Sequence, residues 1–247
     1  MPTVKEVYQF IDKIAPFSTQ EEWDNSGLLV GDENKSVNKI LFALDITYDV
    51  VKQAINNKSD LIITHHPIIF KPVSNILSDS LIYKLIENGI SIISAHTNYD
   101  KAVDGVNDIL CKTINAQDYE KVDGTCLNIA TFARTVPVDD FALYLRGKLG
   151  GVVRYNSFDK KVSKIAVCSG SGSDYLELAK ELKCDALLTG DASHHAFLDA
   201  NESGIALFAC GHFETENIAI KPLAEKMESQ FGVECLLANQ NTPINTI

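Results

Sequence analysis

The chain has 247 residues, of which 45% are hydrophobic, enough to bury the core of one large α/β domain or of two halves. Acidic residues outnumber basic ones by 33 to 22, and the formal charge is −11. This balance argues against generic binding to nucleic acid or to an anionic membrane, because both need a basic surface. It leaves a nucleotide substrate open, because a bound cation can supply positive charge locally.

The six cysteines are scattered, and the sequence contains no Cys-x-x-Cys pair. Several of them sit in apolar runs, where a free thiol behaves as a small buried hydrophobe, and this usage suits a reducing compartment. The N-terminal residues lack the apolar centre of a signal peptide, and no run is long enough to span a bilayer. We therefore expect a soluble, cytoplasmic protein.

Hydrophobic periodicity predicts an amphipathic helix over 3–14, with Thr3 as a candidate N-cap and Glu6 three residues further on. Strands and helices then alternate, a rhythm that favours parallel strands joined by crossover helices. The expected elements are strand 39–45, helix 47–57, strand 61–66, helix 79–88, strand 91–95 and helix 104–115.

The segment 22–31 holds the only tryptophan, Trp23, followed by Asp-Asn-Ser-Gly, which is turn chemistry. Two interpretations stay open. The segment is either a tight connection with Trp23 packed in the core, or part of the wall of a functional site.

The second part of the chain begins with a polar stretch, 117–125, for which we expect a loop. A strand over 127–134, a helix over 139–149 and a strand over 151–155 follow, as a subdomain or an oligomer contact. The alternation then resumes with strand 165–168, helix 174–183, strand 186–189, helix 195–201, strand 205–210, helix 214–229 and strand 232–237.

The predicted fold class is therefore α/β, with two similar α/β halves and mostly parallel sheets. We place the halves at 1–125 and 126–247, with a dinuclear metal site in the crevice between them. The spacing between corresponding elements in the two halves agrees only loosely. The spacing common to α/β proteins explains this agreement about as well as duplication of one half does.

All six histidines lie at or just past the ends of hydrophobic runs. In open α/β sheets ligands bind outside the carboxyl ends of the strands, which is where these imidazoles are expected. His65 and His66 are adjacent; if they extend a strand, their side chains point to opposite sides and reach two different metals. The remaining four are His96, His194, His195 and His212.

His96 is followed four residues later by a carboxylate, Asp100, and His212 is followed in the same way by Glu216. A helix places such a pair on one face, and imidazole with a hard oxygen ligand suits divalent first-row metals. The bland alternative is that His212 caps a helix and that Glu216 is solvated. The predicted dinuclear set, with metals roughly 3.5–4 Å apart, is His65, His66, Asp100, His212 and Glu216.

Five motifs, in order and spread over nearly the whole chain, resemble the Nif-three-like family, whose members are often labelled GTP cyclohydrolase I type 2 homologues. They are Trp23-Asp24-Asn25-Ser26-Gly27-Leu28, Thr64-His65-His66-Pro67, His96-Thr97-Asn98-Tyr99-Asp100, Thr189-Gly190-Asp191 with His195, and Gly211-His212 with Glu216.

The resemblance implies a two-domain α/β protein with a dinuclear metal site, assembled as a homohexamer of stacked trimers. By position it implies the same five metal ligands, with His96 lining the cavity. The chain lacks the long middle insertion of some members and so resembles the short form. Tyr99 stands where an aliphatic residue is more usual, outside the ligand set.

Two further turns have alternative interpretations. The amides of 169–174 could hold a phosphate at a helix N-terminus, or the stretch is a plain βα turn capped by Ser173 or Asp174. In 189–195, Asp191 either orients a histidine, as carboxylates behind metal ligands do, or belongs to another capped βα turn.

The sequence favours a metal-dependent hydrolase that acts on a nucleotide or another phosphate-bearing small molecule, with His96 in proton transfer or substrate contact. Cys210 lies in an apolar run and is a poor candidate for a covalent nucleophile. The alternative is a non-enzymatic metal-binding or adaptor protein. The expected cofactors are two divalent ions per chain, for which zinc, manganese, iron and nickel fit equally.

Overall fold

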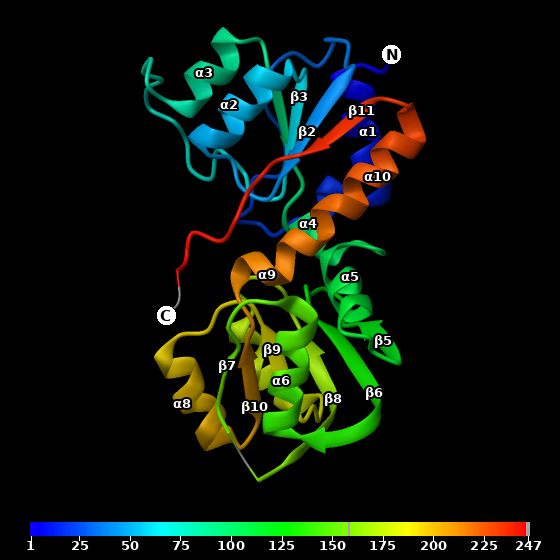
Figure 1. Cartoon of the computed structure of the whole chain (residues 1–247), viewed down its shortest axis with the longest axis vertical. Helices are drawn as coiled ribbons and strands as arrows, with labels where there is room; N and C mark the ends of the chain where they lie inside the picture. Colours follow the sequence, from blue (N-terminus) through cyan, green and yellow to red (C-terminus); the bar gives the residue numbers. More distant parts are fainter. Residues whose placement is uncertain (158, 246–247) are drawn as a thin grey trace. The chain divides into compact units, whose positions relative to one another are not determined.

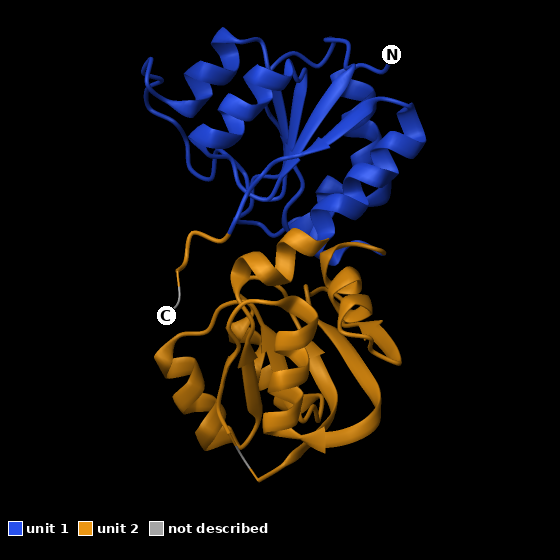
Figure 2. Ribbon diagram, viewed as in Figure 1, with its two compact units in different colours: residues 1–103, 219–241 blue, residues 104–218, 242–247 orange. Residues whose placement is uncertain are grey.

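The computed structural model describes residues 1–157 and 159–245, and the chain divides into two compact units (Figure 2). Unit 1 consists of residues 1–103 and 219–241. Unit 2 consists of residues 104–218 and the C-terminal segment from 242. The first crossing therefore lies at 103/104, whereas we expected it at 125/126, and the chain returns to unit 1 at residue 219.

Unit 1 contains a five-stranded sheet in the order β1-β4-β3-β2-β11. The pairs β4-β3, β3-β2 and β2-β11 are parallel, and β1 lies antiparallel to β4. Four of the strands were expected from the sequence: β2, β3 and β4 in the first half, and β11 in the second. The bounds are β1 (Gly27–Val30), β2 (Lys39–Ala43), β3 (Leu61–Thr64), β4 (Ser91–Ser94) and β11 (Glu234–Leu237).

Helices cover both faces of this sheet: α2 and α3 lie on one face, α1 and α10 on the other (Figure 1). Side chains alternate across each strand, so that Leu41 and Ile62 pack with Val50 of α2 and Leu85 of α3. The capping box predicted at Thr3 and Glu6 is present. The helices are α1 (Val4–Ile14), α2 (Tyr48–Asn57), α3 (Leu81–Glu87), α4 (Thr97–Lys101) and α10 (Ile220–Phe231), with a 3-10 turn at Phe17–Thr19.

The last strand, expected at 232–237 in the second half, is β11 and pairs in parallel with β2, where Cys235 is opposite Ile40. The single helix expected over 214–229 is instead three pieces: α9 (His212–Glu216), a 3-10 turn (Asn217–Ala219) and α10. The chain passes from unit 2 to unit 1 within that turn.

Unit 2 contains a six-stranded sheet in the order β5-β6-β8-β9-β10-β7. Only β8-β9 and β9-β10 are parallel, while the other three pairs are antiparallel. Both sheets are therefore mixed. The prediction of mostly parallel sheets is right for unit 1 and wrong for unit 2, where most pairs are antiparallel. The bounds are β5 (Asp118–Lys121), β6 (Asn128–Pro137), β7 (Arg154–Tyr155), β8 (Lys161–Val167), β9 (Ala186–Thr189) and β10 (Ala206–Ala209).

The prediction of a loop at 117–125 is wrong in part, because this segment contains the edge strand β5, which pairs with β6. The strand could not be recognised in the sequence, because it is polar and contains no apolar run.

Helices pack on both faces of the sheet, and none in residues 1–157 or 159–245 is long and apolar enough to cross a membrane. The helices of unit 2 are α5 (Val106–Thr113), α6 (Val138–Leu149), α7 (Leu176–Glu181), α8 (His194–Ser203) and α9, with a 3-10 turn at Ser173–Tyr175.

The two units share one arrangement. Each has three consecutive parallel strands linked by helices (β2-β3-β4 and β8-β9-β10), and an antiparallel edge strand beside the last of them. In each unit a five-residue helix follows the third strand, and a histidine stands at its start: His96 before α4 and His212 at the first position of α9. The expectation of two similar α/β halves agrees with this topology.

Candidate metal centre

Three histidines of unit 1 come together where β3 and β4 end. The possible ligand atoms of His65, His66 and His96 all lie within 4.8 Å of one another. We call these three residues the histidine cluster. The expected divergence of His65 and His66 is not observed, because β3 ends at Thr64 and both residues lie in the bend that follows. Their ring centroids are 5.1 Å apart.

His65 and His66 are oriented through the same ring atom. Nδ1 of His65 is 2.8 Å from the carbonyl oxygen of Ala95, and Nδ1 of His66 is 2.7 Å from Oδ1 of Asp45. A carbonyl or an ionised carboxylate can only accept, so Nδ1 carries the proton and donates it. The lone pair of each ring is then on Nε2, which is the form of imidazole that binds a metal.

His96 has the same arrangement, with Asp24 as its partner. Nδ1 of His96 is 2.9 Å from Oδ1 of Asp24, whose side chain is fully buried. The carboxylate also accepts from the amide of Asn25, the hydroxyl of Ser26 and both the amide and the hydroxyl of Thr97. Burial alone would raise the pKa of Asp24, but the hydrogen bonds from His96 and Thr97 outweigh it and hold that pKa far below its usual range.

Asp100 supplies the carboxylate of unit 1. It lies on α4 with 7% of its surface exposed, and its Oδ1 is 3.6 Å from Nε2 of His65. The structure therefore brings together all four predicted site residues that belong to unit 1, namely His65, His66, His96 and Asp100.

Unit 2 carries a second imidazole–carboxylate pair at the end of β10. His212 and Glu216 stand one helical turn apart on α9, and Nε2 of His212 is 3.0 Å from Oε2 of Glu216. Two donor atoms at this separation can both bind one cation at roughly 2.0–2.2 Å. Glu216 is 4% exposed, so the alternative of a solvated surface residue is wrong.

Asp191 orients His212, as one of the two interpretations expected. Its Oδ2 is 2.7 Å from Nδ1 of His212, which again leaves the ring's lone pair on Nε2. The other interpretation holds as well, because Ser193 caps α8 by accepting from the amide of Ala196. His194 and His195 lie exposed at the start of α8.

The turn over 169–174 packs against this pair. The amide of Gly170 donates to Oγ1 of Thr215, and the amide of Gly172 donates to Oγ1 of Thr189. These amides are engaged within the protein, which favours a structural βα turn over a phosphate cradle. The expected capping by Ser173 or Asp174 is wrong: the 3-10 turn and α7 both begin without a side-chain cap.

Gly170 gives a direct test of this packing. It has φ +58°, and a Cβ at this position would overlap Oε1 of Glu216 and lie 3.4 Å from Cε1 of His212. We expect Gly170→Ala to displace the Glu216 carboxylate and to weaken binding of divalent metal by about 10–100-fold, as loss of a group that orients a ligand does. Calorimetric titration of the metal-free variant measures this. Gly124→Ala is the control, with φ +73° and nothing within 4 Å of its Cβ.

The sequence did not single out Asp24 and Asp45 as partners of histidines. Asp45 directly follows the apolar run 39–44 and lies at the same sheet edge as His66; this position is the only feature of the sequence that could have indicated its role.

Trp23 was expected either in the core or in a site wall. Its side chain is 62% exposed, so the core interpretation is wrong, and its ring centroid is 5.7 Å from that of His96.

Cysteine chemistry plays no part in these clusters. No cysteine among the described residues forms a disulfide, and Cys210 is fully buried. Burial raises the pKa of the Cys210 thiol far above its usual value, which keeps the sulfur protonated and poorly nucleophilic. The expectation that Cys210 is not a covalent nucleophile agrees with this.

Four histidines thus share one geometry: His65, His66, His96 and His212 each have Nδ1 held by an oxygen acceptor. Metal-binding histidines usually donate their second ring N–H to a carboxylate or a backbone carbonyl in this way. Together with the carboxylates of Asp100 and Glu216, the donor sets of both units fit divalent metal ions.

Fold and donor sets define the class, an α/β protein of two mixed-sheet units with candidate metal ligands at the ends of parallel strands. Residues 2–243 match the family described as Duf34/NIF3 (NGG1p interacting factor 3), and the chain belongs to this family. The resemblance inferred from the motifs is thereby confirmed.

Relatives with assigned names agree with this membership. The chain is 36% identical over 260 residues to a Clostridium acetobutylicum protein named GTP cyclohydrolase 1 type 2 homolog, with 96% of each chain covered. It is 30% identical over 252 residues to the GTP cyclohydrolase 1 type 2 of Helicobacter pylori strain 26695, with both chains fully covered. The crystal structure of a Staphylococcus aureus hypothetical protein superposes with a TM-score of 0.93, at 28% identity and full coverage of both chains.

Proposed function

We propose that this protein binds two divalent metal ions and hydrolyses a nucleotide or another phosphate-bearing small molecule. The observation that supports this most strongly is the shared orientation of four histidines, His65, His66, His96 and His212, each with Nδ1 anchored. The cyclohydrolase names of the relatives favour a nucleotide as the substrate class.

The proposed ligands are the five residues assigned by the motifs, His65, His66, Asp100, His212 and Glu216. Each unit contributes one imidazole–carboxylate pair, His65 with Asp100 and His212 with Glu216. Mixed nitrogen and oxygen donors of this kind suit zinc, manganese, iron and nickel. The homohexamer and the cytoplasmic location expected from the sequence stay predictions.

When bound, two divalent cations supply Lewis acidity: they lower the pKa of water toward neutrality and offset the negative charge of a phosphate group. His96 is the residue proposed to move the proton. Its Nε2 accepts a proton, and Asp24 keeps the Nδ1–H aligned and stabilises the imidazolium that results. The buried carboxylate stays ionised, because the hydrogen bonds from His96 and Thr97 hold its pKa low.

Metal content and turnover together test the proposal. We expect protein purified without chelator to contain about two divalent ions per chain by elemental analysis, and to hydrolyse at least one member of a panel of nucleotides and sugar phosphates. Removing the metals with a chelator should abolish turnover, and adding them back should restore it.

The outcomes separate two classes of function. Two bound ions without turnover of any panel member would contradict the hydrolase and favour the alternative, a non-enzymatic metal-binding or adaptor protein. Failure to bind metal would contradict the hydrolase and the metal-binding form of the alternative, and would leave only the adaptor. Glu216→Gln keeps the size of the side chain while removing its charge, so it separates loss of metal from loss of fold.

A further inference from the structure

We infer that Trp23 and Phe70 form an aromatic surface that stacks on the planar heterocyclic base of the substrate, beside the histidine cluster. We call these two residues the aromatic pair. The inference rests on the proposed function and extends it, because it names which part of the substrate the protein recognises apart from the phosphate.

The first observation is exposure. The side chains of Trp23 and Phe70 are 62% and 46% exposed, although both are large aromatic groups that ordinarily bury most of their surface. Their rings nonetheless lie against each other, with centroids 6.3 Å apart and planes only 14° from parallel. Two near-parallel rings with this much exposed surface are suited to stacking on a third planar ring.

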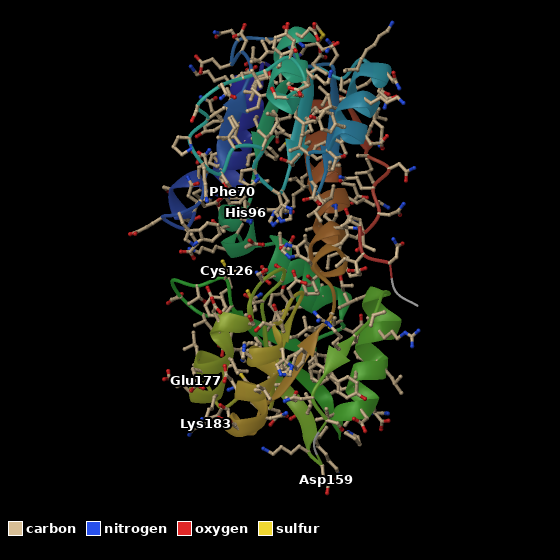
Figure 3. All side chains as sticks on the ribbon, turned by 90° about the vertical axis from the view of Figure 1, so that its left-hand side faces the viewer. Phe70, His96, Cys126, Asp159, Glu177 and Lys183 are labelled. Carbon is tan, nitrogen blue, oxygen red and sulfur yellow. The ribbon has the colours of Figure 1, made fainter. Side chains whose placement is uncertain are left out.

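The second observation is position. Both rings meet the imidazole of His96 edge-on, with centroid separations of 5.7 Å for Trp23 and 5.6 Å for Phe70. Figure 3 shows Phe70 and His96 labelled at the end of unit 1 where the strands terminate. A ring bound on the aromatic pair would therefore place its substituents within reach of the proposed proton-transfer residue.

The third observation is that the backbone holds the pair in place. Trp23 directly precedes Asp24, whose carboxylate is fixed by Thr97 and His96. The side chain of Asn25 donates to the carbonyl oxygen of Ile69, at 2.6 Å, and so ties the segment carrying Trp23 to the segment carrying Phe70. Preorganised rings lose little entropy on binding a ligand.

A nucleotide is the ligand that this arrangement favours over a simple sugar phosphate. Stacking of a base on an aromatic side chain tolerates any base, because each presents a π-face. The aromatic pair thus recognises that a base is present, whereas the metals would recognise the phosphate. Neither interaction alone selects a nucleotide; both together do.

The test uses the fluorescence of Trp23, the only tryptophan of the chain. The full-length protein, both metal-loaded and metal-free, is titrated with guanosine monophosphate, with guanosine, and with ribose 5-phosphate. We expect a saturable change in Trp23 emission with guanosine monophosphate and guanosine, and none with ribose 5-phosphate.

Phe70→Ala should weaken binding of guanosine monophosphate by roughly tenfold, as expected for losing one base–aromatic contact. Phe70→Tyr should retain binding, because it keeps the ring. Tyr83→Ala removes an exposed aromatic side chain from α3 of the same unit and should leave binding unchanged. If Phe70→Ala does not fold, as judged by circular dichroism, Phe70→Leu takes its place.

Equal affinity of wild type and Phe70→Ala (or, in its place, Phe70→Leu) for guanosine monophosphate would overturn the inference, as would the absence of any saturable response in both metal states. So would an identical response to ribose 5-phosphate. Guanosine carries no phosphate, and metal binding is measured separately by calorimetry. Failure of the stacking inference is therefore distinguishable from failure of the metal-dependent function.

Discussion

His66→Ala is expected to lower the affinity of the protein for divalent metal by on the order of 100-fold. Loss of a group that merely orients a ligand costs about 10–100-fold, and here a proposed ligand is itself removed. His66 suits the experiment because its ring is partly exposed and its polar partner, Asp45, is near the surface, so the fold should tolerate the change. Titration calorimetry on metal-free protein measures the affinity directly.

Two variants define the scale of this effect. Asp45→Asn keeps the imidazole but weakens the acceptor that holds Nδ1, and we expect an intermediate loss of about 10-fold. His194→Ala removes an exposed histidine from the start of α8 and should not change the affinity. A ligand that binds only the native state also stabilises it. Added metal should therefore raise the melting temperature most in His194→Ala, less in Asp45→Asn and least in His66→Ala.

Unchanged metal affinity in His66→Ala would show that His66 is not a metal ligand. The same experiment on Glu216→Gln addresses unit 2 independently. If both variants kept full affinity, the proposed ligand set would be wrong, and the proposed hydrolase would lose its physical basis.

The parts of the site that could be predicted from the sequence are those encoded locally. A histidine directly after an apolar run lies at a strand end, and this placed His65, His66 and His96 at one edge of unit 1. Spacing of four on a helix predicted the pairing of His212 with Glu216, whose ligand atoms are 3.0 Å apart. Local rules suffice here because the elements that carry these residues are short and regular.

The contacts that hold the histidines could not be predicted in the same way. Asp24 and His96 are separated by 72 positions, and nothing in the turn chemistry of 22–31 indicates that its carboxylate accepts from a strand-end imidazole. The exposure of Trp23 likewise depends on tertiary packing, because a lone tryptophan is ordinarily a good core residue.

The sheet to which each strand belongs also could not be predicted from local sequence patterns. An apolar run such as that of β11 predicts a strand but not its neighbour, and this strand pairs with β2 almost two hundred residues earlier in the chain. Strand direction depends on such pairings too. The βα rhythm correctly predicted parallel neighbours for β8, β9 and β10, but it carried no information on the antiparallel partner β6.

Asp24→Ala is expected to destabilise unit 1 by about 3 kcal/mol, because several buried hydrogen-bond donors lose their acceptor, at about 1–3 kcal/mol for each group left unsatisfied. The carboxylate is fully buried and accepts from the amide and hydroxyl of Thr97 as well as from His96. Removing it leaves these donors buried without an acceptor, and each such group carries its own desolvation cost. Urea denaturation followed by circular dichroism measures the change in the free energy of unfolding.

Asp79→Ala is the matched control, because Asp79 is an exposed aspartate of the same unit, and its loss should change stability by less than about 0.5 kcal/mol. Asp24→Asn separates the two roles of the side chain. It keeps one acceptor oxygen for Thr97 but loses the charge that fixes the tautomer of His96, so stability should fall less than in Asp24→Ala while turnover still falls. Full stability in Asp24→Ala would show that the buried network does not hold unit 1 together. Full turnover in Asp24→Asn would show that His96 does not depend on this carboxylate.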